Sequence, residues 1–97
     1  MIRSFGSRGT QDLYHGQLHS REVRHIPESV WKCAWRKLDV LNSAADLRDL
    51  KSSPGNRLEK LRGNFKNYYS IRINDQYRII FRFDEGHTYD VEITDYH

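Results

Sequence analysis

Apolar and polar residues alternate in three consecutive runs near the C-terminal end of the chain. Every second residue in each run is aliphatic or aromatic, and the residues between them are mostly polar or charged. The three apolar rows are Tyr69, Ile71 and Ile73; Tyr77, Ile79, Phe81 and Phe83; and Tyr89, Val91 and Ile93. Strict alternation with short gaps predicts three strands of an antiparallel meander that buries one face.

The register of the first hairpin follows from the need for all apolar rows to face the same side. Pairing Tyr69 with Phe81 meets that need and leaves residues 74–76 (Asn-Asp-Gln) as the loop. A slip of one residue would turn an apolar row toward water. This register places Arg72 directly opposite Arg78, and like charges in that position are unfavourable.

The second hairpin is predicted by the same reasoning. Phe81 then faces Val91, Arg82 faces Asp90, and residues 85–87 (Glu-Gly-His) form the loop. The pair formed by Arg82 and Asp90 has complementary charges, which favours this pairing.

A change to helical spacing marks the middle of the chain. Pro27 suits the first helical position, and the acid at Glu28 interacts favourably with the helix dipole. One apolar face follows, made of Trp31, Ala34, Trp35, Leu38 and Leu41. We expect this face, with both tryptophans, to belong to the core.

Shorter elements complete the expected α+β fold, a compact domain with an N-terminal strand and helices packed on one face of the sheet. Residues 1–5 read as a short strand, and Ser7 or Thr10 is a candidate cap for a helix that ends at Tyr14. Residues 16–26 are expected to form a loop. A second helical piece is predicted near residues 44–50, and the turn at residues 52–55 ends it.

Size and composition favour one globular domain over residues 1–97. Hydrophobic residues make up 37% of the 97 and charged residues 30%, which is lean but not a disordered composition. The single cysteine, Cys33, is expected to be at least half-buried, and excludes both an internal disulfide and a zinc site built on cysteines. The sequence has no signal-like segment and no apolar run long enough for a membrane span, so we expect a cytoplasmic protein. We also expect that it needs no cofactor.

Basic residues are concentrated between residues 57 and 82, although the formal net charge of the whole chain is only +3. The only acids in this stretch are Glu59 and Asp75. The bases are Arg57, Lys60, Arg62, Lys66, Arg72, Arg78 and Arg82. This distribution favours an anionic partner.

The arginine pair of the first hairpin has two interpretations. An anion such as phosphate lies between Arg72 and Arg78, which are expected on an exposed sheet face, or the two side chains point apart into water. Neighbouring residues favour RNA as the anion: Tyr68 shares the arginine face, and three bases precede the sheet. A single-stranded nucleic acid uses such charges for its backbone and such rings for its bases. The candidate RNA-binding residues are Arg57, Lys60, Arg62 and Tyr68.

The final residues, Asp95, Tyr96 and His97, supply candidate acid–base groups. A nuclease that uses the 2′-hydroxyl of RNA must accept its proton, stabilise charge on the phosphate and protonate the leaving oxygen. His97 can donate or accept a proton near neutral pH, and Asp95 or Glu59 could act as the base or orient a ring. The alternatives are a surface histidine and an ordinary strand end. Strict alternation also places only Tyr96 on the arginine face, unless the strand ends or twists by about residue 94.

The chain resembles HigB-type toxins of bacterial type II toxin–antitoxin systems, within the RelE superfamily. The resemblance covers nearly the whole chain and is strongest over residues 69–78 and 95–97. It also includes three earlier segments, residues 1–5, 45–50 and 54–59.

The resemblance implies a metal-independent mRNA interferase that acts in the ribosomal A site through attack of the 2′-hydroxyl. It also implies a helix-turn-helix antitoxin as partner, with operator DNA bound only through that antitoxin. Some members have a histidine at the position of Glu59, so Glu59 is either the base in its place or non-catalytic here. By position, the resemblance implicates Arg62, Arg72, Arg78, Asp95, Tyr96 and His97. A gyrase-inhibiting toxin of the ParE type and a passive RNA-binding module are the alternative functions.

Overall fold

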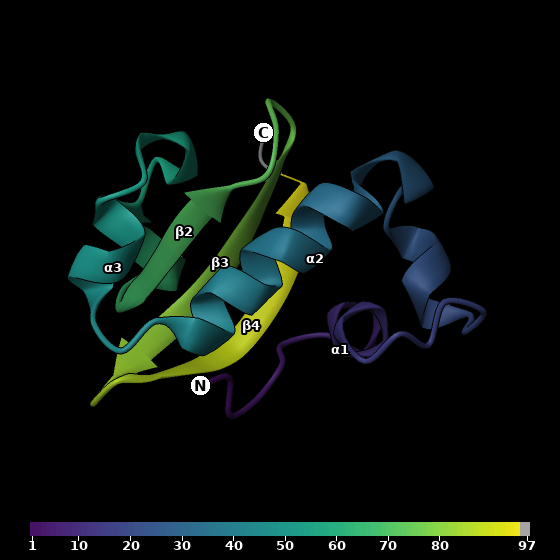
Figure 1. Ribbon diagram of the computed structural model, residues 1–97, viewed down its shortest axis with the longest axis horizontal. Coiled ribbons are helices and arrows are strands. Elements are labelled where there is room, and N and C mark those ends of the chain that lie inside the picture. The colour runs from purple at the N-terminus through teal and green to yellow at the C-terminus, as the bar shows by residue number, and fades with distance from the viewer. Residues whose placement is uncertain (96–97) are drawn as a thin grey trace.

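A computed structural model describes residues 1–95 of the chain, and Tyr96 and His97 lie outside the described residues. Short helices precede a sheet that occupies the C-terminal part (Figure 1). The α-helices are α1 (Arg8–Tyr14), α2 (Glu28–Ser43) and α3 (Leu47–Lys51), and the 3₁₀ helices are η1 (Glu22–His25), η2 (Pro54–Asn56) and η3 (Gly63–Phe65). The strands are β1 (Glu59–Lys60), β2 (Tyr68–Arg72), β3 (Tyr77–Asp84) and β4 (His87–Asp95).

The four strands form one antiparallel sheet in the order β1-β2-β3-β4, and α2 lies across one face of it (Figure 1). The buried core lies between α2 and this face. From α2 it takes Val30, Ala34, Leu38 and Leu41, and from the strands Ile71, Ile79, Phe81, Val91 and Ile93. The predicted α+β fold and meander are confirmed.

The first hairpin has the predicted register. Tyr69 pairs with Phe81, and Arg72 pairs with Arg78. The side chain of Asn74 accepts hydrogen bonds from the backbone amides of Gln76 and Tyr77, at 2.9 and 2.7 Å. These bonds close the loop from within, so turn chemistry and apolar alternation specify the same register.

The second hairpin departs from its predicted register. Ile79 pairs with Ile93 as expected, but past a β-bulge Arg82 pairs with Tyr89, and the turn has only two residues, Glu85 and Gly86. Asp90 occupies the bulge with a φ of 54°. The extra residue reverses the facing of Tyr89, which leaves the apolar row and joins Arg82.

The N-terminal segment is not the strand that its sequence predicts. Ile2 and Phe5 make isolated parallel bridges to Thr88 and Val91 of β4. The segment therefore follows the free edge of β4, but the bulge at Asp90 interrupts regular pairing. Beyond the segment, the Thr10 hydroxyl accepts a hydrogen bond from the Ile93 amide at 2.9 Å. Together these contacts protect the outer edge of the sheet.

The start of α1 matches the expectation, because the Ser7 side chain caps this helix and accepts from the Thr10 amide at 3.2 Å. Helix α2 begins one residue later than predicted, at Glu28, and Pro27 is its N-cap residue. The second helical piece is α3, where a capping box between Asp46 and Asp49 replaces a start near residue 44. The hydrogen bond from the backbone amide of Arg48 lowers the pKa of Asp46, as expected of a carboxylate that caps a helix.

The periodic pattern predicts both tryptophans of α2 in the core, and this prediction is wrong for Trp35. Trp31 is half-buried and donates its indole N–H to the carbonyl of Ile26 at 2.7 Å, whereas Trp35 is 47% exposed. The face of α2 that packs on the sheet is narrower than predicted, because the aliphatic residues Val30, Ala34, Leu38 and Leu41 fill it. Cys33 is half-buried as expected, and no described helix is long and apolar enough to cross a membrane.

Candidate functional site

The sheet face opposite α2 carries three of the predicted basic residues and is named the arginine face. The strand registers place Ser70, Arg72, Arg78 and Arg82 on it, and they align Glu59 with Ser70. The pairing of β2 with β1 and with β3 therefore brings Glu59, Ser70 and Arg78 together.

Arg78 is the fixed centre of this face. Its Nε donates to the hydroxyl of Ser70 at 2.8 Å, and its Nη2 donates to the carbonyl of Arg57 at 2.6 Å. The same nitrogen lies 3.9 Å from Oε1 of Glu59. These contacts hold the planar guanidinium in one orientation, which a flexible surface arginine would not have.

The burial of Arg78 corrects the expectation of an exposed arginine. The residue is only 6% exposed, because its side chain crosses toward Ser70 and β1 instead of extending into water. A buried charge of this kind needs hydrogen bonds from its surroundings to offset lost hydration. Sequence reasoning missed Ser70, whose only signal was a small hydroxyl residue among larger neighbours on the same strand.

The carbonyl that Arg78 contacts is held in place by an unusual backbone turn. Arg57 follows η2 in the left-handed region, with a φ of 45°. The preceding Asn56 is 2% exposed, donates to the carbonyl of Leu50 at 3.1 Å and accepts from Lys37. The contribution of Arg57 in this structure is thus a backbone acceptor, while its side chain is exposed.

Arg72 has a different partner although it faces Arg78 across the strands. Its guanidinium forms an ion pair with Asp75 in the hairpin loop. The like charges thus turn to different partners, and each has an acceptor of its own. The interpretation in which both arginines point apart into water is wrong, since Arg78 turns into the protein. An anion between Arg72 and Arg78 stays a prediction.

Aromatic rings and a third arginine occupy the other end of the arginine face. Tyr68 lies opposite Arg82, whose guanidinium sits 5.5 Å from the ring centre of Tyr89 and 2.8 Å from a carboxylate oxygen of Asp90. The hydrogen bond to Asp90 raises the pKa of Arg82. Phe65 packs edge-on against Tyr68, with 5.8 Å between ring centres. These rings offer stacking surfaces beside a fixed charge.

A basic groove adjoins the short strand β1. It has a volume of about 410 Å³, and its lining includes Lys60, Arg62 and Lys66. All three side chains are exposed. Two of the predicted RNA-binding residues therefore meet in one hollow, close to Glu59.

Glu59 and Asp95 differ in their relation to Arg78. The side chain of Glu59 is 51% exposed and pairs with Arg78, so it faces both water and the guanidinium. Asp95 pairs with Tyr77 and accepts from the side chain of Gln76 at 3.1 Å. Regular pairing to residue 95 excludes a strand end at residue 94, and alternation sends Asp95 away from the arginine face. The predicted roles of Tyr96 and His97 fall outside the described residues.

The arrangement suits an anion better than a metal ion. Within residues 1–95 no three histidine, cysteine or acidic side chains gather as metal ligands. In their place lie an oriented guanidinium, an adjacent carboxylate and a basic groove. Such a site can bind a phosphodiester and move a proton beside it.

Solved structures of other proteins share this fold of helices on one sheet face. The structure matches a chain of the YoeB–YefM complex from Staphylococcus aureus with a TM-score of 0.60 and 20% identity, covering 100% of this chain and 98% of that chain. YafQ from Escherichia coli matches with a TM-score of 0.57 and 14% identity, over 98% of this chain and 91% of that chain. Identities this low show the fold alone.

The sequence is similar to a family narrower than the fold. Residues 4–97 match the family described as RelE-like toxin of type II toxin–antitoxin system HigB. Toxin HigB-1 of Vibrio cholerae serotype O1 is 42% identical over 78 residues, which cover 78% of this chain and 82% of that toxin. The chain therefore belongs to the HigB-like toxin family of type II toxin–antitoxin systems, as its resemblance predicted.

Proposed function

We propose that this toxin is an endoribonuclease that cuts messenger RNA in the ribosomal A site and so inhibits translation. The observation that carries the proposal is Arg78, a buried guanidinium held by Ser70 and the Arg57 carbonyl beside an exposed carboxylate. A preorganised charge stabilises an anionic transition state more than a mobile one does, because it needs no reorganisation during the reaction.

Cleavage in this proposal uses the RNA's own nucleophile and needs no metal. Glu59 accepts the proton of the 2′-hydroxyl, whose oxygen attacks the adjacent phosphorus. The bond from phosphorus to the 5′-oxygen breaks, and His97 or Tyr96 protonates that leaving oxygen. The products are a 2′,3′-cyclic phosphate and a 5′-hydroxyl. Arg78 and Arg72 stabilise the additional negative charge on the phosphoryl oxygens.

The remaining proposed residues bind RNA or support the site. Lys60 and Arg62 contact backbone phosphates in the basic groove, and Tyr68 stacks on a base. Arg57 acts through its carbonyl on Arg78, and its exposed side chain adds to the basic surface. Asp95, which lies off the arginine face, acts by orienting the end of β4 that leads to Tyr96 and His97.

Ribosomes programmed with a defined messenger provide the test. The toxin is added with an occupied or an empty A site, and primer extension maps the 5′ ends of the fragments. We expect cleavage within the A-site codon only when ribosomes are present and the A site is empty. Cleavage of free RNA at the same rate would refute ribosome dependence, and intact messenger would refute the nuclease.

The same preparation separates the nuclease from the alternative functions. A ParE-type toxin would inhibit DNA supercoiling by gyrase and leave the messenger intact. A passive RNA-binding module would bind ribosomes without producing new ends. We further propose that the antitoxin is a helix-turn-helix protein and that the toxin reaches operator DNA only through it.

A further inference from the structure

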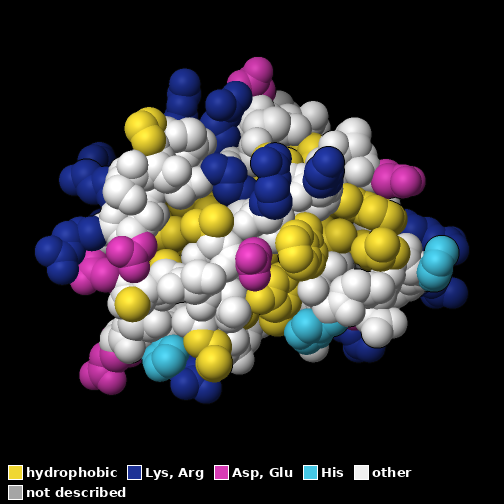
Figure 2. All heavy atoms as spheres, viewed as in Figure 1, with side chains coloured by type: hydrophobic (Ala, Val, Ile, Leu, Met, Phe, Trp, Pro, Cys, Tyr) yellow, Lys and Arg dark blue, Asp and Glu magenta, His cyan; other side chains and the backbone are white. Residues whose placement is uncertain are grey.

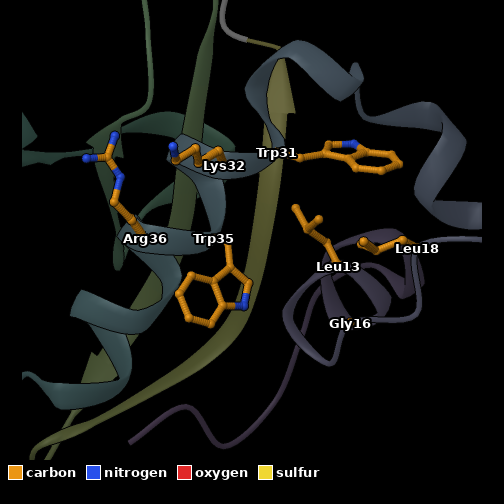
Figure 3. Close-up of a pocket in the computed structure, with 7 residues that line it drawn as sticks. All are labelled: Leu13, Gly16, Leu18, Trp31, Lys32, Trp35 and Arg36. Carbon is orange, nitrogen blue, oxygen red and sulfur yellow. The ribbon is translucent and has the colours of Figure 1, made fainter.

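An apolar groove of about 380 Å³ lies on the helical side of the molecule, between α1 with the turn that follows it and the first half of α2 (Figure 3). Trp31 and Trp35 project from α2 toward Leu13 and Leu18 on the other wall (Figure 3). The nuclease proposed above uses none of these residues.

The groove exposes more apolar surface than the fold requires. Trp35 is 47% exposed and Leu18 is 42% exposed, although α2 already covers the sheet with other residues. Exposed aromatic side chains grouped in a hollow mark protein-binding sites more often than scattered single residues do.

Charge along α2 indicates what kind of partner fits. Trp31 and Trp35 are four residues apart and form one row on the helix, and Lys32 and Arg36 form the adjacent row. These two bases are the only charged residues among those that line the groove in the described part of the chain. Dark blue and yellow side chains lie next to each other along α2 in Figure 2.

We propose that this groove docks the antitoxin through an amphipathic helix whose apolar ridge contacts Trp31 and Trp35 and whose neighbouring acids pair with Lys32 and Arg36. The proposal rests on the toxin's membership of a toxin–antitoxin family, and it does not require that the toxin cut RNA. A helix laid in an apolar groove places side chains at the spacing that these two rows repeat.

The same charges disfavour a second copy of this chain as the occupant. In a two-fold symmetric contact the same patch meets itself, so Lys32 and Arg36 of both copies would gather around one apolar centre. Like charges brought together at an interface raise its free energy. An acidic partner gains from the arrangement that penalises self-association.

Asp39 restricts where the acids of the partner can lie. Asp39 follows Trp35 by one helical turn. Burial raises the pKa of the Tyr14 phenol, and the nearby charge of Asp39 raises it further. The acids of the antitoxin therefore belong at the Lys32 and Arg36 side and not beside Asp39. Since α2 packs on the sheet face opposite Arg78, this contact by itself leaves the arginine face uncovered.

The test is calorimetric titration of the full toxin with its purified antitoxin. The double variant Lys32→Glu with Arg36→Glu is compared with Lys60→Glu with Lys66→Glu, which makes the same charge change at the basic groove. We expect the first pair to weaken binding by roughly 10- to 1,000-fold, and the second by less than about threefold, because close charge pairs at an interface couple strongly. Equal effects, or a larger loss for the second pair, would overturn the proposal.

Trp35→Ala gives an independent measurement, because Trp35 lies outside the buried core and its removal should leave the fold intact. We expect at least about a tenfold loss of affinity, as for aromatic anchors elsewhere. Wild-type affinity in this variant would also overturn the proposal. Messenger cleavage by the same variants, measured without antitoxin, shows separately whether the nuclease proposal holds.

Discussion

Arg78 carries a positive charge where little water reaches it, and its neighbours determine what that charge can do. Its hydrogen-bond acceptors come from β2 and from the turn before β1, and they include the Ser70 hydroxyl, the Ser70 carbonyl and the Arg57 carbonyl. Only arginine offers donors at these separate angles, since a lysine presents a point charge on a flexible stem. The orientation of Arg78 thus depends on Ser70 and on the backbone at Arg57.

Replacing Ser70 with alanine tests this dependence. Ser70 is fully buried, and the loss of a hydrogen bond to a charged group should lower the free energy of unfolding by about 1–3 kcal/mol. In the folded variant we expect a lower cleavage rate with an unchanged KM, because Arg78 loses its orientation and the basic groove is untouched. Denaturant melts and single-turnover cleavage measure the two effects.

Ser43→Ala is the matched control, since Ser43 is exposed at the end of α2. It should change neither quantity. If Ser70→Ala lost stability but cleaved at the normal rate, the positioning role would be wrong.

Glu92 gives the molecule a pH dependence with a definite sign. Burial raises its pKa above the ordinary value of 4.5, so the folded state disfavours the ionised form. The unfolded chain releases this proton first, and stability therefore falls as the pH rises from 4.5 through the folded pKa.

We expect Glu92→Gln to raise the Tm at pH 7 and to leave it unchanged at pH 4, where both states bind the proton. Thermal melts across this range provide the measurement. An equal shift at both pH values would mean that the carboxylate is not penalised by burial.

Among the elements, the sheet was predictable because two independent signals agreed on its register. Alternation set the facing of Tyr69 and Phe81, and the Asn74 loop closed the hairpin at the same point. The register of the second hairpin was not predictable, because a bulge adds one residue without changing the composition of the strand. Asp90 in the left-handed region carries no signal that distinguishes it from a polar strand residue, and the facing of Tyr89 depends on it.

The arginine pair of the candidate site was predictable from the sequence, but the contacts of its side chains were not. The excess of bases and the opposed arginines were visible in the sequence, and the strand pairing confirms that Arg72 and Arg78 are neighbours. The burial of Arg78 was not visible in the sequence, since it depends on the backbone turn at Arg57. The exposure of Trp35 was likewise hidden, because helical periodicity identifies an apolar face but not how wide a surface it covers.

Packing of α1 against η1 depends on a glycine. A β-carbon on Gly9 would lie 2.7 Å from the carbonyl oxygen of Glu22, a backbone atom without freedom to move aside. Gly9→Ala should therefore destabilise the fold by about 1–3 kcal/mol, even though alanine favours a helix.

Gly55 is the control for that substitution, because a β-carbon there meets nothing within 4 Å. Equilibrium unfolding in urea compares the two variants. Stabilisation by Gly9→Ala would show that α1 and η1 do not approach as closely as the structure has them.

At the scale of the whole molecule, the sheet separates two surfaces. The arginine face and the basic groove gather phosphate-binding chemistry, whereas the opposite side carries α2 and the apolar groove. The first surface suits RNA and the second suits a protein. One small domain thereby has room for both proposed partners, RNA and the antitoxin.

Phosphate binding predicts a salt dependence of ribosome binding. A base that binds an RNA phosphate releases counterions, so each bound phosphate adds about 0.7 to the slope of log affinity against log salt. We expect Lys60→Ala with Arg62→Ala to reduce the slope by roughly 1.4 on this basis, as measured by sedimentation at several salt concentrations. An unchanged slope would remove the basic groove from the RNA-binding surface.

The most direct test of the central claim is to map messenger 5′ ends in cells that express the toxin. Wild type is compared with Arg78→Ala and with Arg82→Ala, an arginine on the same face that is exposed and outside the cluster around Ser70. We predict new ends in phase with the reading frame for wild type and for Arg82→Ala, and their loss by about a hundredfold or more in a folded Arg78→Ala protein. Ends without phase, or phased ends that persist in Arg78→Ala, would contradict the account.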